Sequence, residues 1–261
     1  MKISKIKYIT FLSASILLMN ISCSKKEKPE ADEPSLDDNT PTDASMFYQL
    51  QRVENFGGDT EYDGPVDGAR NAIFFSLDTK KGISENYQKS NRWDLSFSDI
   101  YNAKIGSNNG KSTSSLGTGS SGIGGIYITE KPFDEVIDIP ADSEFKTSVF
   151  LDSNGSFGDG IGWAIYDFTG TTIGNGDDNK AHVCYALGNP LNLNNGKTLV
   201  RTLVRTLIVK TAKGNYAKIK MISLYKNVFA PIDMNRQSES PFFTFEYILV
   251  PKGSTKFEIN Q

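Results

Sequence analysis

The chain has 261 residues, with 28 Lys and Arg against 31 Asp and Glu, and its formal net charge is −3. Its first 22 residues hold three of the Lys and none of the acidic residues, so the remainder carries a charge of −6. This acidic balance argues against the basic surface that a nucleic-acid-binding protein needs, and we expect no nucleic acid as a partner.

The N-terminus has the pattern of an export signal. Lys2, Lys5 and Lys7 form a basic start, a charge-free stretch runs from Tyr8 to Ser22, and Cys23 follows. A basic region and a short apolar region before a small residue are typical of a secretory signal, and the stretch is shorter than the roughly 20 apolar residues that span a bilayer. A Cys directly after the cut resembles a bacterial lipoprotein signal, in which that Cys carries acyl chains such as palmitate. We therefore predict a signal peptide over residues 1–22 and lipidation of Cys23, with an ordinary secretory signal as the alternative.

Residues 23–45 are predicted to be the acylated Cys and a disordered charged tether. Charged residues and three prolines dominate residues 24–45, and Leu36 is their only large apolar residue. Such a segment buries too little apolar surface to offset its ordering entropy, so we expect it to be extended and solvated. The charged segment Ser24–Glu27 resembles the export signal of surface lipoproteins in the Bacteroidetes. We expect a lipid anchor in the outer membrane at the cell surface, with the periplasmic face as the alternative.

Residues 46–261 have the pattern of a single all-β domain. Short segments alternate apolar with polar residues and are rich in β-branched and aromatic residues, which indicates strands. The main expected strands cover residues 71–77, 93–97, 123–129, 162–168, 203–211, 216–225 and 242–250. No segment carries a long helical period, so we predict mostly antiparallel strands.

Local patterns refine this prediction. In the segment 216–225, Ile219 and Met221 fall on one face while Lys218 and Lys220 fall on the other. The preceding residues 211–215 predict a hairpin turn in which a glycine adopts a positive φ.

Two further segments are less regular. Residues 131–140, bounded by prolines, fit a single helical turn. The sequence Leu-Val-Arg-Thr at 199–202 repeats at 203–206, and this pattern fits either a strand face or a helical stripe.

A glycine-rich segment, residues 106–125, contains Gly110-Lys111-Ser112. A phosphate-binding P-loop needs a glycine five positions before its Gly-Lys-Ser, and here that position is Ile105. We therefore expect a flexible Gly/Ser loop between strands rather than a nucleotide site.

No pattern in the chain predicts a catalytic or metal site. Residues 152–159 and 177–179 space their oxygen-bearing side chains as calcium loops do, but they lack the glycine and the closing Glu, so we expect turns. His182 is the only histidine, and no nucleophile elbow of the Gly-x-Ser-x-Gly kind is present. We predict that the protein is not an enzyme.

Three segments together resemble the HmuY family of Bacteroidetes lipoproteins. Residues 91–97 (NRWDLSF) resemble its N-x-W-D-h-x-F strand, where h is hydrophobic, and a glycine-rich loop follows in the same place. Residues 210–219 (KTAKGNYAKI) resemble its K-T-x-x-G-x-Y-A-K-h signature, and residues 243–247 resemble its last strand. The resemblance covers about residues 70–250.

This resemblance implies an all-β HmuY-like domain over residues 46–261 and a role in iron acquisition. The best-known members capture haem at the cell surface and deliver it to a TonB-dependent receptor, and they hold the iron with two His or Met side chains. One of these follows the W-D-h-x-F strand, where this chain has Ser98 and Asp99. The second usually falls about thirty residues later, and residues 126–134 hold no His or Met. The ligand pair of the family is therefore not matched.

Other residues could supply the ligand types that haem iron takes, which are His, Cys, Met and Tyr. Met234 is the first candidate axial ligand, because it lies in a polar loop that we expect to be exposed, with Arg236 nearby to meet a propionate. His182 is the second candidate. Met221 falls on an apolar strand face, where core packing is its expected role.

Two functions from different classes remain open at this stage. The first is haem capture and delivery, with haem as the cofactor-like ligand. The second is a non-haem binding module on the same scaffold, which recognises a protein, a glycan or another small ligand through exposed aromatic residues, namely Tyr87, Tyr101, Tyr127 and Tyr166.

Overall fold

The computed structural model describes residues 36–61, 63–64, 68–147, 161–173, 176–194 and 198–258, which belong to one compact unit. The predicted signal peptide, Cys23 and the first part of the tether lie outside the described residues, as does the calcium-like segment 152–159. None of the described helices has the length and apolarity that crossing a bilayer requires.

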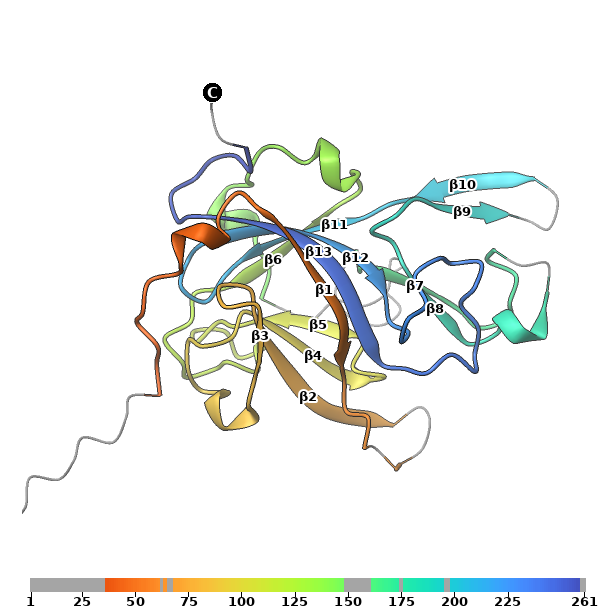
Figure 1. The fold of residues 1–261 in the computed structure, drawn as a ribbon, viewed down its shortest axis with the longest axis horizontal. Coiled ribbons are helices and arrows are strands. Elements are labelled where there is room, and N and C mark those ends of the chain that lie inside the picture. Colours follow the sequence, from red (N-terminus) through yellow and green to blue (C-terminus); the bar gives the residue numbers. More distant parts are fainter. Residues whose placement is uncertain are drawn as a thin grey trace, which may run out of the picture. The chain divides into compact units, whose positions relative to one another are not determined.

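Two antiparallel sheets form the body of the fold (Figure 1). The five-stranded sheet has the order β1 (Leu50–Gly57), β13 (Phe242–Val250), β12 (Tyr216–Ser223), β11 (Thr206–Lys210), β6 (Gly125–Thr129). The four-stranded sheet has the order β3 (Lys81–Ile83), β2 (Ala69–Ser76), β4 (Leu95–Ile100), β5 (Lys104–Ser107). All pairs within both sheets are antiparallel, as the sequence predicts.

Two ribbons and five short helices complete the described structure (Figure 1). The ribbons pair β7 (Ala164–Asp167) with β8 (Val183–Ala186), and β9 (Leu191–Asn194) with β10 (Leu199–Leu203). The helices are all single 3₁₀ turns: η1 (Ala44–Met46), η2 (Glu85–Tyr87), η3 (Phe133–Glu135), η4 (Asp142–Glu144) and η5 (Asp178–Lys180).

The structure confirms the hairpin turn and the helical turn, and it decides the pattern that the sequence left open. Gly214 has a φ of 95° in the hairpin turn between β11 and β12, where the amide of Thr211 donates to the carbonyl of Asn215. The helical turn expected within residues 131–140 is η3. The repeated Leu-Val-Arg-Thr falls on two strands: its first copy is exposed on β10, and the end of its second copy is buried at the start of β11.

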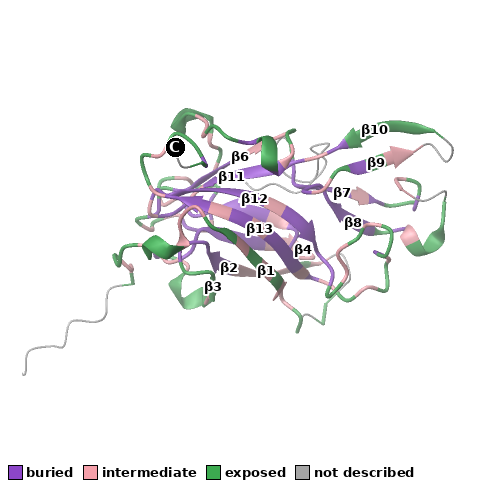
Figure 2. Cartoon of the chain, turned by 45° about the horizontal axis from the view of Figure 1, so that its top comes forward, coloured by how far each residue is buried: buried purple, intermediate pink, exposed green. Residues whose placement is uncertain are grey.

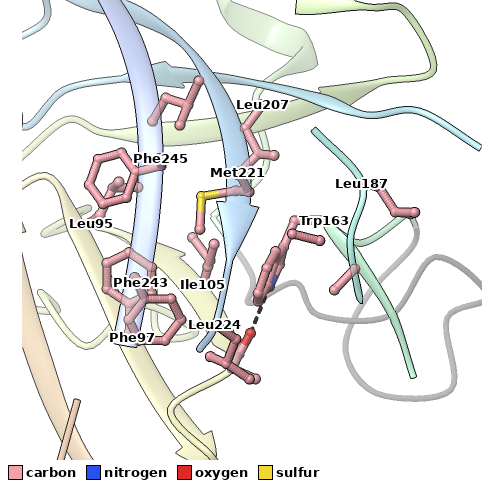
Figure 3. Close-up of a cluster of buried hydrophobic side chains, with 14 of the residues drawn as sticks. Leu95, Phe97, Ile105, Trp163, Leu187, Leu207, Met221, Leu224, Phe243 and Phe245 are labelled. Atoms are coloured by element: carbon pink, nitrogen blue, oxygen red, sulfur yellow. Dashed lines mark hydrogen bonds between the residues drawn. The ribbon is translucent and has the colours of Figure 1, made fainter. Parts of the chain in front are cut away.

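The main core lies between the two sheets (Figure 2). Aromatic rings meet across it, with Phe97 of β4 4.1 Å from Phe243 of β13, and Phe75 5.3 Å from Phe245 between ring centroids. Each buried aromatic ring removes about 150–250 Å² from water, so these pairs dominate the packing. Figure 3 shows Trp163 beside this cluster, where its indole N–H donates to the carbonyl of Ala103.

A second, smaller core covers the other face of the five-stranded sheet. It contains Val136, Ile208, Tyr216, Val250 and Phe257. Lys218, on the strand face opposite Ile219 and Met221, reaches into this layer and is buried, and its Nζ donates to the carbonyls of Phe133 and Val136.

The end of the expected tether is docked and not disordered. Within residues 36–45, the amide of Asp38 donates to Asn91 Oδ1 at 2.8 Å, and Lys213 Nζ donates to the carbonyl of Thr40 at 2.9 Å. The amide of Asn91 donates in turn to Asp37 Oδ1. Polar partners elsewhere in the chain hold this segment, although it has little apolar surface of its own.

The glycine-rich segment is also more ordered than we expect from its composition. The buried Asn108 side chain donates to the carbonyls of Ser90 and Trp93 and accepts from Ser120 Oγ. A Cβ on Gly110 would lie 1.7 Å from the carbonyl oxygen of Ser120, so the close approach of the backbone requires glycine there.

Candidate functional site

A pocket of about 340 Å³ lies at the end of β12 that is remote from the 211–215 hairpin. This volume is at the low end of the range for small-molecule sites. The lining residues come from four separate segments: Tyr101 from the β4–β5 turn, Tyr166 from β7, His182 and Cys184 from the start of β8, and Leu224, Tyr225, Arg236 and Ser240 from the β12–β13 connection.

The pocket brings together two of the residues that the sequence singles out, His182 and Arg236. His182 is exposed and has a φ of 59°, and its ring lies 6.4 Å from that of Tyr166 and 6.1 Å from that of Phe168. A positive φ costs free energy in a non-glycine residue, and such residues cluster at functional sites. Arg236 Nη2 lies 2.5 Å from the carboxylate of Asp178, which places its charge at the rim.

Met234 does not line the pocket, and its side chain is fully buried in the main core. The expectation that Met234 is exposed is therefore wrong. Its amide donates to the carbonyl of Pro231, and Lys180 Nζ donates to its carbonyl at 2.7 Å, so the polar loop turns this one apolar side chain inward. To reach a ligand, the Met234 sulfur would have to leave the core.

Cys184 and Tyr225 form the floor of the pocket. The hydroxyl of Tyr225 accepts a hydrogen bond of 2.9 Å from the amide of Cys184, and both side chains are almost fully buried. Burial raises the pKa of Tyr225 well above its ordinary value, so this phenol stays protonated.

Tyr101 and Tyr166 form the aromatic wall. Their rings stack with centroids 6.5 Å apart. Burial, followed by the interaction with Tyr101, raises the pKa of Tyr166, so this phenol keeps its proton. The sequence names both residues only as exposed aromatics, because nothing in their spacing shows that they meet.

The resemblance places one axial ligand at Ser98 or Asp99. In this structure both side chains instead interact with Lys104. Asp99 forms an ion pair with Lys104 across the β4–β5 turn, and the hydrogen bond to Lys104 holds the pKa of Asp99 below its ordinary value. Ser98 Oγ donates to the carbonyl of Lys104. Among the described residues, no group of three or more His, Cys, Asp or Glu side chains is placed to hold a metal ion.

Two of the segments that carry the family resemblance meet through Asp94, and neither lines the pocket. Asp94, from the W-D-h-x-F strand, accepts from the amide of Ala212 in the turn of the K-T-x-x-G segment at 2.8 Å, and from the amide of Leu77 at 2.7 Å. Trp93 is buried, and its indole N–H donates to the carbonyl of Gln88.

The model of the HmuY protein family matches residues 69–247, which is more than half of the chain. The chain belongs to the HmuY family. A search of curated proteins finds no match.

Solved structures include distant HmuY-like neighbours. A HmuY-like protein from Bacteroides vulgatus is 15% identical with a TM-score of 0.37, covering 79% of this chain and 94% of its own. Apo PinO from Porphyromonas gingivitis is 12% identical with a TM-score of 0.35, covering 78% and 99%. The apo HmuY analog of Tannerella forsythia is 15% identical with a TM-score of 0.33, covering 78% and 96%. The family match, and not these low scores, carries the assignment.

The residues of the HmuY signature in this chain thus hold the fold together. Asp94 and the 211–215 turn join the two sheets, while the residues that line the pocket lie outside these motifs.

Proposed function

We propose that this protein binds haem in the pocket beside β12. The observation that carries the proposal is that His182 and Arg236 line the same aromatic pocket in a chain of the HmuY family. The donor set fits the group: His and Tyr are both ligand types for haem iron, and tyrosine rings together with Leu224 supply apolar surface for a macrocycle.

Each residue has a role in this proposal. His182 is the axial ligand, because its imidazole is exposed at the pocket mouth. Arg236 is the propionate partner, because its guanidinium lies at the rim and could exchange the exposed carboxylate of Asp178 for that of a ligand. Met234 stays a less favoured candidate because of its burial.

The biological setting is part of the proposal. Residues 1–22 act as a lipoprotein signal peptide, Cys23 carries the acyl chains, and residues 46–261 form the HmuY-like domain. The anchor holds the protein in the outer membrane at the cell surface, where it captures haem and delivers it to a TonB-dependent receptor. The support is the sequence pattern of the N-terminus and the family to which the chain belongs.

A second candidate function is a non-haem binding module on the same scaffold. The observation that favours it is the ion pair of Asp99 with Lys104, which occupies the place of a family ligand. The rings of Tyr166 and Phe168, 4.5 Å apart, would then serve as a stacking surface for a glycan or another small ligand.

A haemin titration of the soluble mature chain, starting at Ser24, tests the proposal. We expect a saturable shift of the Soret band that His182→Asn abolishes, since Asn tolerates the positive φ at this position but does not ligate iron. Arg236→Ala should weaken binding, while Arg201→Ala, an exposed arginine on β10, should not. A folded protein with no spectral shift overturns haem binding and favours the second candidate.

A further inference from the structure

Residues 36–43 lie on the surface of the domain as a strap that leads into η1 (Figure 1). Every residue of the strap is exposed or half-buried, and none belongs to either hydrophobic core. Polar contacts alone hold it. A segment with few buried apolar contacts and exposed hydrogen bonds belongs to the least stable part of a fold, so the strap can leave the surface while the domain stays folded.

The domain reads two adjacent acids of the strap. The amide of Asn91 donates to Asp37 Oδ1 at 2.9 Å, and the Nζ of Lys213 lies 3.5 Å from Asp38 Oδ2. Asn91 and Lys213 come from segments that are more than 100 residues apart in the sequence. The fold thus brings two separate donors to one place, where they match two successive carboxylates.

The domain also binds the backbone of the strap. Arg92 Nε donates to the carbonyl of Leu36 at 2.6 Å, and Lys213 Nζ donates to the carbonyl of Thr40 at 2.9 Å. Contacts to main-chain carbonyls do not depend on the side chains of the bound segment. The surface therefore suits an extended acidic chain in general, and the strap is one example of such a chain.

The strap does not fill the surface that it covers. A cavity of about 580 Å³ lies between the strap and the domain, and its lining includes Lys213, Lys252 and the apolar side chain of Ile123. Among the described residues that line it, Asp38 of the strap is the single acid. Without the strap, this surface would be a basic groove with an apolar floor and room for side chains larger than those of the strap.

We propose that this groove is a docking site for an extended acidic segment of a partner protein, and that the strap occupies it as an internal competitor. The partner segment places two adjacent acids where Asp37 and Asp38 lie now. A tethered competitor has an effective concentration on the order of millimolar, so the strap screens the groove from weak ligands and gives way to a stronger one. The proposal does not depend on haem binding.

Fluorescence anisotropy of a labelled peptide that copies residues 36–43 tests the groove in the mature chain, which starts at Ser24. Asp37→Ala combined with Asp38→Ala weakens the strap and leaves the groove intact, so this double variant should bind the peptide about fivefold more tightly than the wild-type chain. Adding Lys213→Ala to the double variant should remove the gain. Adding Lys111→Ala instead is the matched control and should not, because Lys111 is exposed and does not line the cavity.

A second peptide, with Asn in place of both acids, tests the role of charge without altering the protein. It should bind the double variant about fivefold more weakly than the acidic peptide, because charge-assisted hydrogen bonds are stronger than neutral ones. Equal affinity for the two peptides, or no saturable binding to the double variant, overturns the proposal. Wild-type dimers in sedimentation that the double variant does not form would also overturn it, since they would show that the strap of a second copy is the occupant.

Discussion

The carboxylate of Asp94 accepts a hydrogen bond of 2.8 Å from the amide of Ala212, 118 residues further along the chain. The bond joins two of the segments that resemble HmuY, residues 91–97 and 210–219, and Asp94 is buried beside a second acid, Asp78. Asn215, in the same turn as Ala212, donates to Asp78 Oδ1 at 3.0 Å. The hairpin between β11 and β12 is thus attached to the four-stranded sheet through two neighbouring carboxyl groups.

This pair predicts that stability falls as pH rises through the neutral range. Burial, followed by repulsion from Asp78, raises the pKa of Asp94 to about 8, and burial raises that of Asp78 as well. Carboxyl groups whose pKa is raised by folding contribute their full stability below the ordinary Asp pKa near 4, and this contribution is lost as the pH increases towards the pKa of the folded state. Thermal denaturation between pH 5 and about pH 8 should therefore show a decreasing Tm.

Asp78→Asn tests the origin of this slope. The amide keeps an acceptor for Asn215 and removes the charge that faces Asp94, while the other charges near Asp78, Lys213 and Asp38, stay in place. The fall of Tm with pH should become shallower in this variant. A wild-type Tm that is constant or rises over the same range would contradict the prediction.

The docked N-terminal segment predicts that truncation costs stability. Removal of residues up to 43 deletes the bonds that Asn91, Lys213 and Asn215 make to residues 37–42. Each such bond contributes about 0.5–1.5 kcal/mol, but ordering the segment opposes this gain, so we expect a net loss of about 1 kcal/mol. Urea denaturation of chains starting at Ala44 and at Leu36 measures it, with a chain starting at Ser24 as the control. Identical midpoints for all three would show that the docking is energetically neutral.

Composition misjudges this segment for a physical reason. Disorder is predicted from low apolar content, but residues 36–45 are held by hydrogen bonds to Asn91, Lys213 and Asn215, which come together only in the fold.

Alternation predicts β13 at its exact bounds, whereas it misses the irregular edge strand β1 and the four-residue strand β5, because a mixed or very short segment carries little periodicity. The sequence also supplies the residue types of the pocket without showing that four distant segments assemble it.

Lys218 is predicted to stabilise the fold more than its strand neighbour Lys220. Its Nζ donates to the carbonyls of Phe133 and Val136 and lies 4.6 Å from the centre of the Phe133 ring. Lys218→Met leaves two carbonyls without their donor, which costs about 1–3 kcal/mol for each buried unsatisfied group. Lys220→Met, on the same strand face but partly exposed, should change stability by less than about 0.5 kcal/mol. Equal effects of the two substitutions in chemical denaturation would refute this assignment.

Because His182 is exposed and Met234 is buried, we expect substitutions at the two positions to have opposite effects on haem binding and on stability. Met234 is fully buried, so Met234→Ala should destabilise the protein by about 2–5 kcal/mol and leave the Soret shift of bound haemin in place at temperatures where the protein is folded. His182 is exposed, so His182→Asn should keep the wild-type Tm and lose the Soret shift. Thermal denaturation and haemin titration of both variants give four results that must agree. Retained haem ligation in His182→Asn together with its loss in a folded Met234→Ala protein would mean that the β12–β13 loop opens and that the methionine, not the histidine, reaches the iron.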